Sequence, residues 1–267
     1  MPRPITTPDV PVIVAASILS VYEAPMLPIV KVGASPTHVK EGVTLFQAIG
    51  SQPIISLLRE TKPKDYYKIL WNSCTTTSIW IGALGYDDNL DELLRVFVLT
   101  GFGDAKVDSP PSPPALITLN EVVGLYREGK LSCEMGAKDV ASPAVVVDCD
   151  TPLMEAMNLM CEVRIRRLFL RGKAGEFVSD RNILAFLFSP KGLKIARDAP
   201  DEWTDLRLSD IQSMFARVVS SDESVEQVGR MVEPGSDVFV LSDNESVISR
   251  WDLVIKPWKA EKLRLSM

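Results

Sequence analysis

A hydroxyl and a carboxylate lie three residues apart near the end of the sequence, in the stretch 246–252. Val247 and Ile248 predict a short strand, and Ser249 to Asp252 predict the first turn of the helix that follows. Residues three apart share one face of a helix, and the first turn has unpaired backbone N–H groups that favour negative charge. The pair therefore either caps the helix, which is the commoner use of this spacing, or binds a diol beside an anion, as in ribose 5′-phosphate.

The same kind of strand-to-helix junction recurs three times earlier in the chain. From last to first, the four pairs are Ser249/Asp252, Ser179/Asn182, Thr118/Glu121 and Gly50/Pro53. The fourth junction is complete, whereas the second has the longer glutamate, which reaches a diol less directly. The third has an amide that accepts hydrogen bonds without a charge, and the first has neither group. We therefore expect ligand occupancy to fall in the order fourth, second, third, with the first site empty.

Five arginines near these junctions are candidates for binding a phosphate. They are Arg166, Arg167, Arg181, Arg217 and Arg250. Each has an equally good alternative as a solvated side chain at a strand edge or as one half of a rim ion pair.

The junctions belong to a repeated unit of strand, helix, strand, strand and helix. They recur about 60 to 70 residues apart, a period longer than that of common solenoids. We predict an α/β fold of four such units, at 1–60 (degenerate), 61–130, 131–190 and 191–267, paired into modules 1–130 and 131–267. Single units of this size bury little apolar surface, which predicts pairing.

Apolar periodicity defines the helices between the strands. Leu153, Ala156, Met157 and Met160 form one such stripe, typical of a helix lying on a core. The segments 61–77 and 189–213 are predicted to be connectors, and Ser221-Asp222 and Thr151 to be helix caps. Apolar faces as broad as the stripe predict either a flat dimer or an intramolecular disc of the two modules.

Composition excludes several classes of protein. The 267-residue chain is 46% hydrophobic and has a formal net charge of −6, which argues against a nucleic-acid-binding surface. The four cysteines form no C-x-x-C pair, and the single histidine, His38, is predicted to lie in a surface loop. Neither a signal peptide nor a membrane-spanning run is recognisable, so we expect a cytoplasmic protein without metal or cofactor.

Residues 131–267 resemble a tandem pair of cystathionine-β-synthase (CBS) domains, called a Bateman module. The resemblance is carried by four segments, which are 145–148 (Val-Val-Val-Asp), 151–156 (Thr-Pro-Leu-Met-Glu-Ala), 165–168 (Ile-Arg-Arg-Leu) and 177–184 (Phe-Val-Ser-Asp-Arg-Asn-Ile-Leu). The stretch 246–252 matches the family pattern of apolar residues, Ser or Thr, two variable residues and Asp. Residues 1–130 are assigned from the repeat. Four CBS units in one chain are similar to gamma subunits of AMP-activated protein kinases and their archaeal relatives.

The resemblance implies binding of an adenosine nucleotide, AMP, ADP or ATP, or of a related adenosyl compound, in clefts between paired units. In the family the aspartate accepts hydrogen bonds from the ribose hydroxyls, the Ser or Thr hydroxyl contacts ribose or phosphate, and basic side chains meet the phosphates. The sequence lacks a nucleophile–base pair and a phosphate loop, so we expect a non-catalytic regulator that signals to an unknown protein partner. The alternative is an interaction scaffold whose ligand sites have decayed.

Overall fold

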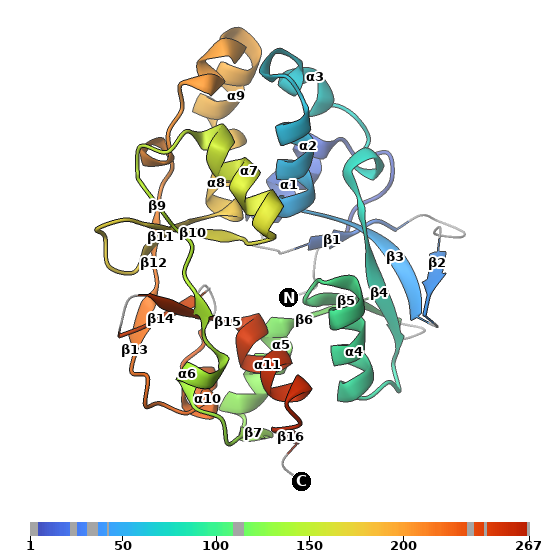
Figure 1. Cartoon of the computed structure of the whole chain (residues 1–267). Coiled ribbons are helices and arrows are strands. Elements are labelled where there is room, and N and C mark those ends of the chain that lie inside the picture. Colours follow the sequence, from blue (N-terminus) through green and yellow to red (C-terminus); the bar gives the residue numbers. More distant parts are fainter. Residues whose placement is uncertain are drawn as a thin grey trace. The chain divides into compact units, whose positions relative to one another are not determined.

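The computed structural model describes residues 5–21, 26–30, 37–41, 43–108, 115–233, 238–242 and 245–265 (Figure 1). The chain forms two compact units. The first comprises Met1–Ala83, Val146–Arg171 and Phe177–Met214, and the second comprises Leu84–Val145, Gly172–Glu176 and Phe215–Met267. The first unit thus combines elements of repeats one and three, and the second those of repeats two and four. The sequence-based modules group the repeats differently, and they stay a prediction together with their boundaries.

The helices of the first unit come from both ends of its sequence. They are α1 (Val12–Val21), α2 (Ser51–Glu60), α3 (Tyr66–Ile69), α7 (Leu153–Val163), α8 (Asp180–Leu187) and α9 (Pro190–Asp198), with 3-10 turns η1 (Pro63–Asp65), η2 (Cys74–Thr77), η3 (Pro200–Thr204) and η4 (Leu208–Asp210). The strands are β1 (Met26–Pro28), β2 (Thr37–Lys40), β3 (Val43–Gly50), β4 (Ile79–Gly85), β9 (Val146–Val147), β10 (Arg167–Leu170), β11 (Glu176–Ser179) and β12 (Met214–Phe215).

Strand β3 is central to one sheet of the first unit. Strands β1, β2 and β4 all pair with it in antiparallel fashion. In the other sheet β10 pairs with β9 in parallel and with β11 in antiparallel register. Both β3 and β11 run directly into a helix, so their last residues form the first and third junctions.

The second unit has the corresponding elements. Its helices are α4 (Leu90–Thr100), α5 (Leu119–Arg127), α6 (Ala137–Val140), α10 (Val225–Arg230) and α11 (Arg250–Lys259). Its strands are β5 (Asp104–Asp108), β6 (Ala115–Thr118), β7 (Leu131–Cys133), β8 (Ser142–Pro143), β13 (Arg217–Val219), β14 (Val238–Leu241), β15 (Ser246–Ser249) and β16 (Leu263–Leu265). Strands β13, β14, β15 and β8 form one sheet in that order, β5 pairs with β6, and β7 pairs with β16.

The element order confirms the predicted repeat. Repeats two, three and four read β4-α4-β5-β6-α5, β9-α7-β10-β11-α8 and β13-α10-β14-β15-α11. Repeat one reads α1-β1-β2-β3-α2, and ahead of α1 the described residues make a single parallel bridge, between Thr6 and Ile29. The fold is therefore α/β with four units of the predicted kind.

In the first unit the helix stripe predicted from sequence faces a helix of another repeat. Leu153, Ala156, Met157 and Met160 are buried on α7, and α2 packs against both α7 and α8 (Figure 1). Burial of Leu153, Met157 and Met160 contributes about 1.5–3 kcal/mol per side chain to the stability of the fold. The stripe is thus covered within the chain, without a second copy.

The helices of the second unit pack in the same way. Helix α5 lies against α10 and α11, and the fully buried Tyr126 of α5 donates a hydrogen bond of 2.9 Å to the carbonyl of Leu253. Burial raises the pKa of Tyr126 well above its ordinary value, so the phenol stays a donor. Gly229 of α10 lies flat on this ring, where an added Cβ would come within 2.5 Å of Tyr126 Cδ2.

Two segments predicted to be connectors contain helices. The segment 189–213 holds α9, η3 and η4, and 61–77 holds η1, α3 and η2. Ser189 caps α9 and Pro190 occupies its first turn, a start signal that the prediction overlooked. Gly192 permits close contact with α8, because a Cβ there would come within 2.3 Å of the Phe186 carbonyl oxygen. The short helix is stabilised by tertiary packing, and Pro190, Gly192 and Pro200 are the residues that favour a connector in the sequence.

Three local predictions were wrong. The cap of α10 is Ser224, whose hydroxyl accepts from the Gln227 N–H, rather than Ser221-Asp222. Helix α7 starts after Pro152 without a side-chain cap, so Thr151 does not cap it. His38 lies in strand β2 instead of a loop.

The structure has no helix that is both long and apolar enough to span a membrane among the residues it describes.

Replacing Gly229 by alanine is expected to destabilise the protein by about 1–3 kcal/mol, because the methyl group would overpack against the Tyr126 ring. Gly124→Ala in α5 is the matched control. A Cβ at Gly124 would meet only the end of Arg127, at 3.9 Å, so alanine should be neutral or stabilise by up to about 1 kcal/mol through helix propensity. Urea unfolding of both variants measures the difference, and equal effects would contradict this packing.

Candidate functional site

All three junctions with a hydroxyl are capping boxes. Ser249, Ser179 and Thr118 each end a strand, and each side-chain oxygen accepts from a backbone N–H in the first turn of the helix. In return, the side chain three residues later accepts from the backbone N–H of the capping residue. The capping interpretation of the spacing is therefore realised at every one of them. Gly50, at the first junction, makes no side-chain cap. Any ligand at these junctions must compete with, or add to, bonds that the chain already makes.

The fourth junction holds a buried carboxylate with partners on both oxygens. Asp252 is only 5% exposed. Its Oδ2 accepts from the Ser249 backbone N–H at 2.8 Å and from the Ser249 hydroxyl at 2.6 Å. Its Oδ1 accepts from the Ser142 hydroxyl at 2.9 Å and from the Lys256 ammonium at 2.9 Å. One fixed donor and one rotatable hydroxyl thus serve each carboxylate oxygen.

Lys256 binds more than the carboxylate. Its Nζ is 2.6 Å from the carbonyl oxygen of Val140, 3.1 Å from that of Ala141 and 2.8 Å from Ser142 Oγ. These residues lead into β8, which pairs with β15 through Ser142 opposite Val247. The ammonium therefore joins residues 140–142, which precede β9, to the helix that carries Asp252.

Two predicted arginines lie at the same end of this sheet. Arg250 is the first residue of α11, next to Ser249. Arg217 opens β13, opposite Phe239 of β14, while Val238 is opposite Ser249. Two strand spacings place the Arg217 backbone about 10 Å from β15. The fold thus brings Arg217 and Arg250 to the complete junction, although they are 33 residues apart in the numbering of the chain.

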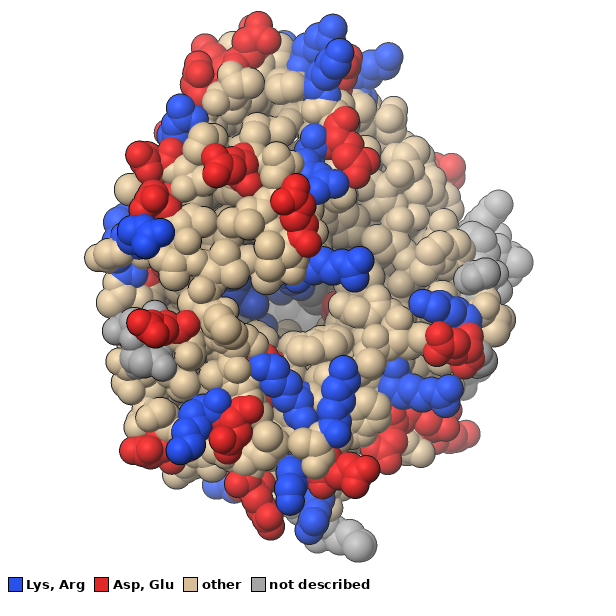
Figure 2. Space-filling view, viewed as in Figure 1, with Lys and Arg blue, Asp and Glu red and all other residues tan. Residues whose placement is uncertain are grey.

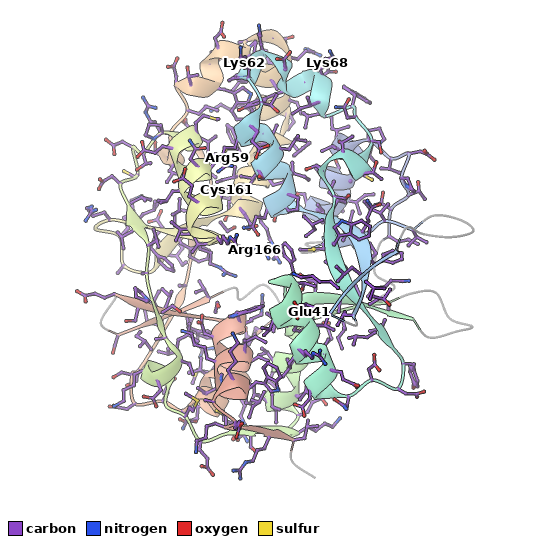
Figure 3. The ribbon with its side chains drawn as sticks, turned by 45° about the vertical axis from the view of Figure 1, so that its right-hand side comes forward. Glu41, Arg59, Lys62, Lys68, Cys161 and Arg166 are labelled. Carbon is purple, nitrogen blue, oxygen red and sulfur yellow. The ribbon has the colours of Figure 1, made fainter. Side chains whose placement is uncertain are left out.

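The first and third junctions are connected directly by a buried polar cluster. The Ser51 hydroxyl, on the first residue of α2, donates to Asp180 Oδ2 at 2.6 Å, and Asp180 is the first residue of α8. Arg166, which is labelled in Figure 3, donates from Nε to the same oxygen at 2.8 Å and from Nη2 to Ser51 Oγ at 3.2 Å. Asp180 is 3% exposed. Arg166 therefore has an internal anion as its partner, which matches the ion-pair alternative for this arginine.

The other predicted residues are distributed over both units. Arg167 opens β10 opposite Ser179, and Arg181 is the second residue of α8. At the third junction Asn182 Oδ1 accepts from the Ser179 N–H and hydroxyl at 3.0 and 2.6 Å. At the second, Glu121 Oε2 accepts from the Thr118 N–H and hydroxyl at 2.8 and 2.7 Å.

Sequence reasoning missed four residues that complete these sites. They are Ser51, Ser142, Asp180 and Lys256. Asp180 and Lys256 flank the predicted pairs on the same helices, so a charged residue next to a junction was the available signal. Ser51 and Ser142 reach the sites only through the fold, because each lies more than 100 residues from its partner.

The cysteines give no sign of reactivity. All four are free thiols, and burial raises the pKa of Cys74, Cys133 and Cys161. Raised pKa values keep these thiols protonated and weakly nucleophilic. In the part of the chain that the structure describes, no group of three or more His, Cys, Asp or Glu side chains is placed to hold a metal ion.

Charged side chains are mixed over the face drawn in Figure 2, where Lys and Arg lie among Asp and Glu. The basic residues of that face are local features, and each depends on its own neighbours. At the fourth junction those neighbours include a buried carboxylate.

Solved structures show what this chain is similar to in fold. No protein-family model matches the sequence, and no curated protein matches it. Protein MJ1225 from Methanocaldococcus jannaschii, described as a candidate archaeal homologue of γ-AMPK, superposes with a TM-score of 0.78 and 15% sequence identity, over 97% of this chain and 96% of that chain. The chain has the fold of this archaeal protein. The predicted similarity to four-unit archaeal relatives of the kinase gamma subunit is thereby confirmed for the fold.

Two other solved structures are less similar. An uncharacterised conserved protein from Pyrococcus horikoshii has a TM-score of 0.47 and 14% identity over 86% of this chain and 89% of that one. The CBS domain protein PAE2072 from Pyrobaculum aerophilum, complexed with AMP, has a TM-score of 0.35 and 17% identity over 48% of this chain and 99% of that one. The fold assignment rests on the Methanocaldococcus protein alone.

Two ion pairs of equal geometry test the buried cluster. Asp180 pairs with Arg166 and Asp148 with Arg171, each at 2.8 Å from Nε, but the Asp180 side chain is 4% exposed and that of Asp148 58%. Asp180→Ala is expected to cost about 3–5 kcal/mol of unfolding free energy, because it removes a buried carboxylate that accepts from both the Ser51 hydroxyl and the Arg166 guanidinium.

Asp148→Ala is the control and should cost less than about 1 kcal/mol, since exposed pairs are screened by water. Chemical denaturation of both variants gives the comparison. A loss at Asp180 no larger than that at Asp148 would mean that the cluster does not stabilise the first unit.

Proposed function

We propose that this protein is a non-catalytic regulator that binds an adenosine nucleotide, AMP, ADP or ATP, at the fourth strand-to-helix junction and passes the ligand state to a protein partner. The observation that carries the proposal is the buried Asp252 carboxylate beside the Ser249 hydroxyl, with Arg217 and Arg250 at the same end of the sheet. The resemblance of the motif to CBS domains supplies the ligand class, and the likeness in fold is consistent with it.

The chemistry of the junction suits a nucleoside monophosphate unit. A carboxylate that accepts from two neighbouring hydroxyl groups selects a ribose diol, and charge-assisted bonds of this kind contribute about 1.5–3 kcal/mol each. The N-terminus of α11 presents N–H groups and a positive dipole end, which favour a phosphate. Arg217 and Arg250 add positive charge at the same place. In this proposal the ligand belongs to the adenine nucleotides, and the arginines contribute to its affinity by binding the phosphates.

The remaining junctions take lower places in this proposal. The second junction retains a carboxylate in Glu121, so it is the next candidate. At the third, Asn182 offers a neutral acceptor and Arg166 is already bound to Asp180. The first junction has no hydroxyl or carboxylate at Gly50 and Pro53, and we assign it no ligand.

A scaffold whose sites have decayed is the second candidate function. The Ser51–Asp180–Arg166 cluster favours it, because side chains of the first and third junctions bind one another. In such a scaffold the junctions serve only packing and capping, and the partner binds regardless of nucleotide. The two candidate functions differ in whether nucleotide binds at all.

Asp252→Ala should weaken AMP binding by about 10- to 1,000-fold, because two bonds to the ribose hydroxyls are lost. The lower end applies where the ligand hydroxyls replace serine hydroxyls on the carboxylate. Asn182→Ala, which removes a neutral acceptor at the third junction, should have a smaller effect. Calorimetric titration of AMP and ATP into each protein measures the affinities.

The Asp252 variant must be checked for folding, because it also removes a cap and the partner of Lys256. Circular dichroism melting serves this purpose. If the alanine variant does not fold, Asp252→Asn replaces it, because asparagine keeps the size of the side chain and one acceptor oxygen. Absence of binding to the unmodified protein, or equal affinity in the unmodified and Asp252 proteins, would exclude a sensor at this junction and favour the scaffold.

A further inference from the structure

The Asp252 carboxylate has two kinds of donor, and they differ in how easily a ligand displaces them. The Ser249 N–H is fixed by the backbone of the helix start. The Lys256 ammonium is held by Asp252, Ser142 Oγ and two carbonyl oxygens at once. In contrast, the hydroxyls of Ser142 and Ser249 reach the carboxylate through a single rotatable bond. Each carboxylate oxygen of Asp252 therefore accepts from one fixed donor and from one rotatable hydroxyl.

We propose that Lys256 is a positioning residue that clamps Asp252, and that the Ser142 hydroxyl occupies the place of a ribose hydroxyl until the nucleotide displaces it. The inference rests on the proposed function of the fourth junction and adds the two residues that determine its affinity and its output. Neither residue belongs to the motif that predicted the junction.

The bond count at the carboxylate supports this exchange. Two oxygens offer about four acceptor positions, and the four donors from Ser142, Ser249 and Lys256 fill them. A diol that binds there brings two hydroxyl donors, so two donors must leave. The two serine hydroxyls are the donors of the same chemical kind, and after rotation they are free to donate to ligand or solvent oxygens.

The exchange also provides an output. Ser142 belongs to β8, whose pairing with β15 comprises only Ser142 opposite Val247 and Pro143 opposite Ser246. When the ligand displaces the Ser142 hydroxyl, this two-residue strand loses its hydrogen bond to Asp252 of α11 and keeps the backbone pairing and the Lys256 bonds to Ser142 Oγ and to the carbonyls of residues 140 and 141. The segment that leads into repeat three therefore responds to occupancy of repeat four.

Ser142→Ala tests the exchange. It should bind AMP about 3- to 10-fold more tightly than the unmodified protein, because no hydroxyl has to be displaced from Oδ1. The gain should vanish for 2′,3′-dideoxyadenosine monophosphate, which lacks both hydroxyls. Ser132→Ala is the matched control, since Ser132 is a half-buried serine of the same unit whose hydroxyl donates to the Arg264 carbonyl, and it should leave both affinities unchanged.

Lys256→Met tests the clamp, because methionine keeps the apolar stem without the charge. The ratio of AMP to dideoxy-AMP affinity should fall at least about fivefold, as an unclamped carboxylate no longer presents both oxygens to the diol. Lys256→Arg should restore part of the ratio. Lys259→Met, three residues later on the same helix and exposed, is the control and should leave the ratio as it is.

Calorimetry with both nucleotides separates the outcomes. If the unmodified protein binds no AMP, the proposed function fails and the clamp with it. If it binds AMP but Ser142→Ala gains no affinity, the exchange is wrong while nucleotide binding stands. An unchanged or raised ratio in Lys256→Met overturns the clamp, and if that variant does not fold, the Ser142→Ala result decides alone.

Discussion

The N-terminal ends of the helices impose the constraint on which the rest of this structure depends. A helix that begins directly at the end of a buried strand has backbone N–H groups without partners. In three of the four repeats a hydroxyl and an acceptor three residues later satisfy them, at distances of 2.6–3.5 Å. Because these groups are fixed by folding, they are also preorganised for a ligand that offers hydroxyls and an anion.

The same constraint separates the four junctions. At the fourth, Asp252 retains a charge and is balanced by Lys256, so the chain holds a carboxylate in a buried position at the cost of a second charged residue. At the first, Gly50 supplies no cap, and Ser51 instead bonds to Asp180 of the third repeat. The polar side chains of the first and third junctions thus bind one another. At the fourth junction the polar side chains bind the Asp252 carboxylate, and a ligand can replace some of these donors.

Helix packing across repeats is what allows such small units to be stable. Helix α2 lies on α7 and α8, and α5 lies on α10 and α11. Close approach depends on residues without side chains at the contact, since Gly229 lies on the Tyr126 ring and Gly192 on the backbone of α8. Interiors of proteins are close-packed, so even one methyl group at these positions has to displace a neighbour. The polar cluster of Ser51, Asp180 and Arg166 adds specificity to one of these interfaces.

The sequence by itself determined the repeat, the order of strands and helices and the position of every junction. Each of these is a local property, expressed as periodicity of apolar residues and as a hydroxyl three residues before an acceptor. The order in which the junctions are expected to bind ligand stays a prediction, because three of them form the same capping box. Helix α9 escaped, because Pro190, Gly192 and Pro200 favour a loop in this segment of the sequence, whereas the proline at 190 occupies the first turn of the helix.

Only the tertiary structure decided which distant residues meet. Ser142 reaches Asp252 and Ser51 reaches Asp180 across separations of 110 and 129 residues. Sequence spacing carries no information about such contacts, because they depend on how strands pair and helices pack. Only the tertiary structure therefore shows which carboxylate pairs with Arg166. The same holds for the two carbonyl oxygens bound by Lys256, which come from a segment more than 100 residues earlier in the chain. The pairing of Lys256 with Asp252 itself is a local contact between residues four apart on one helix.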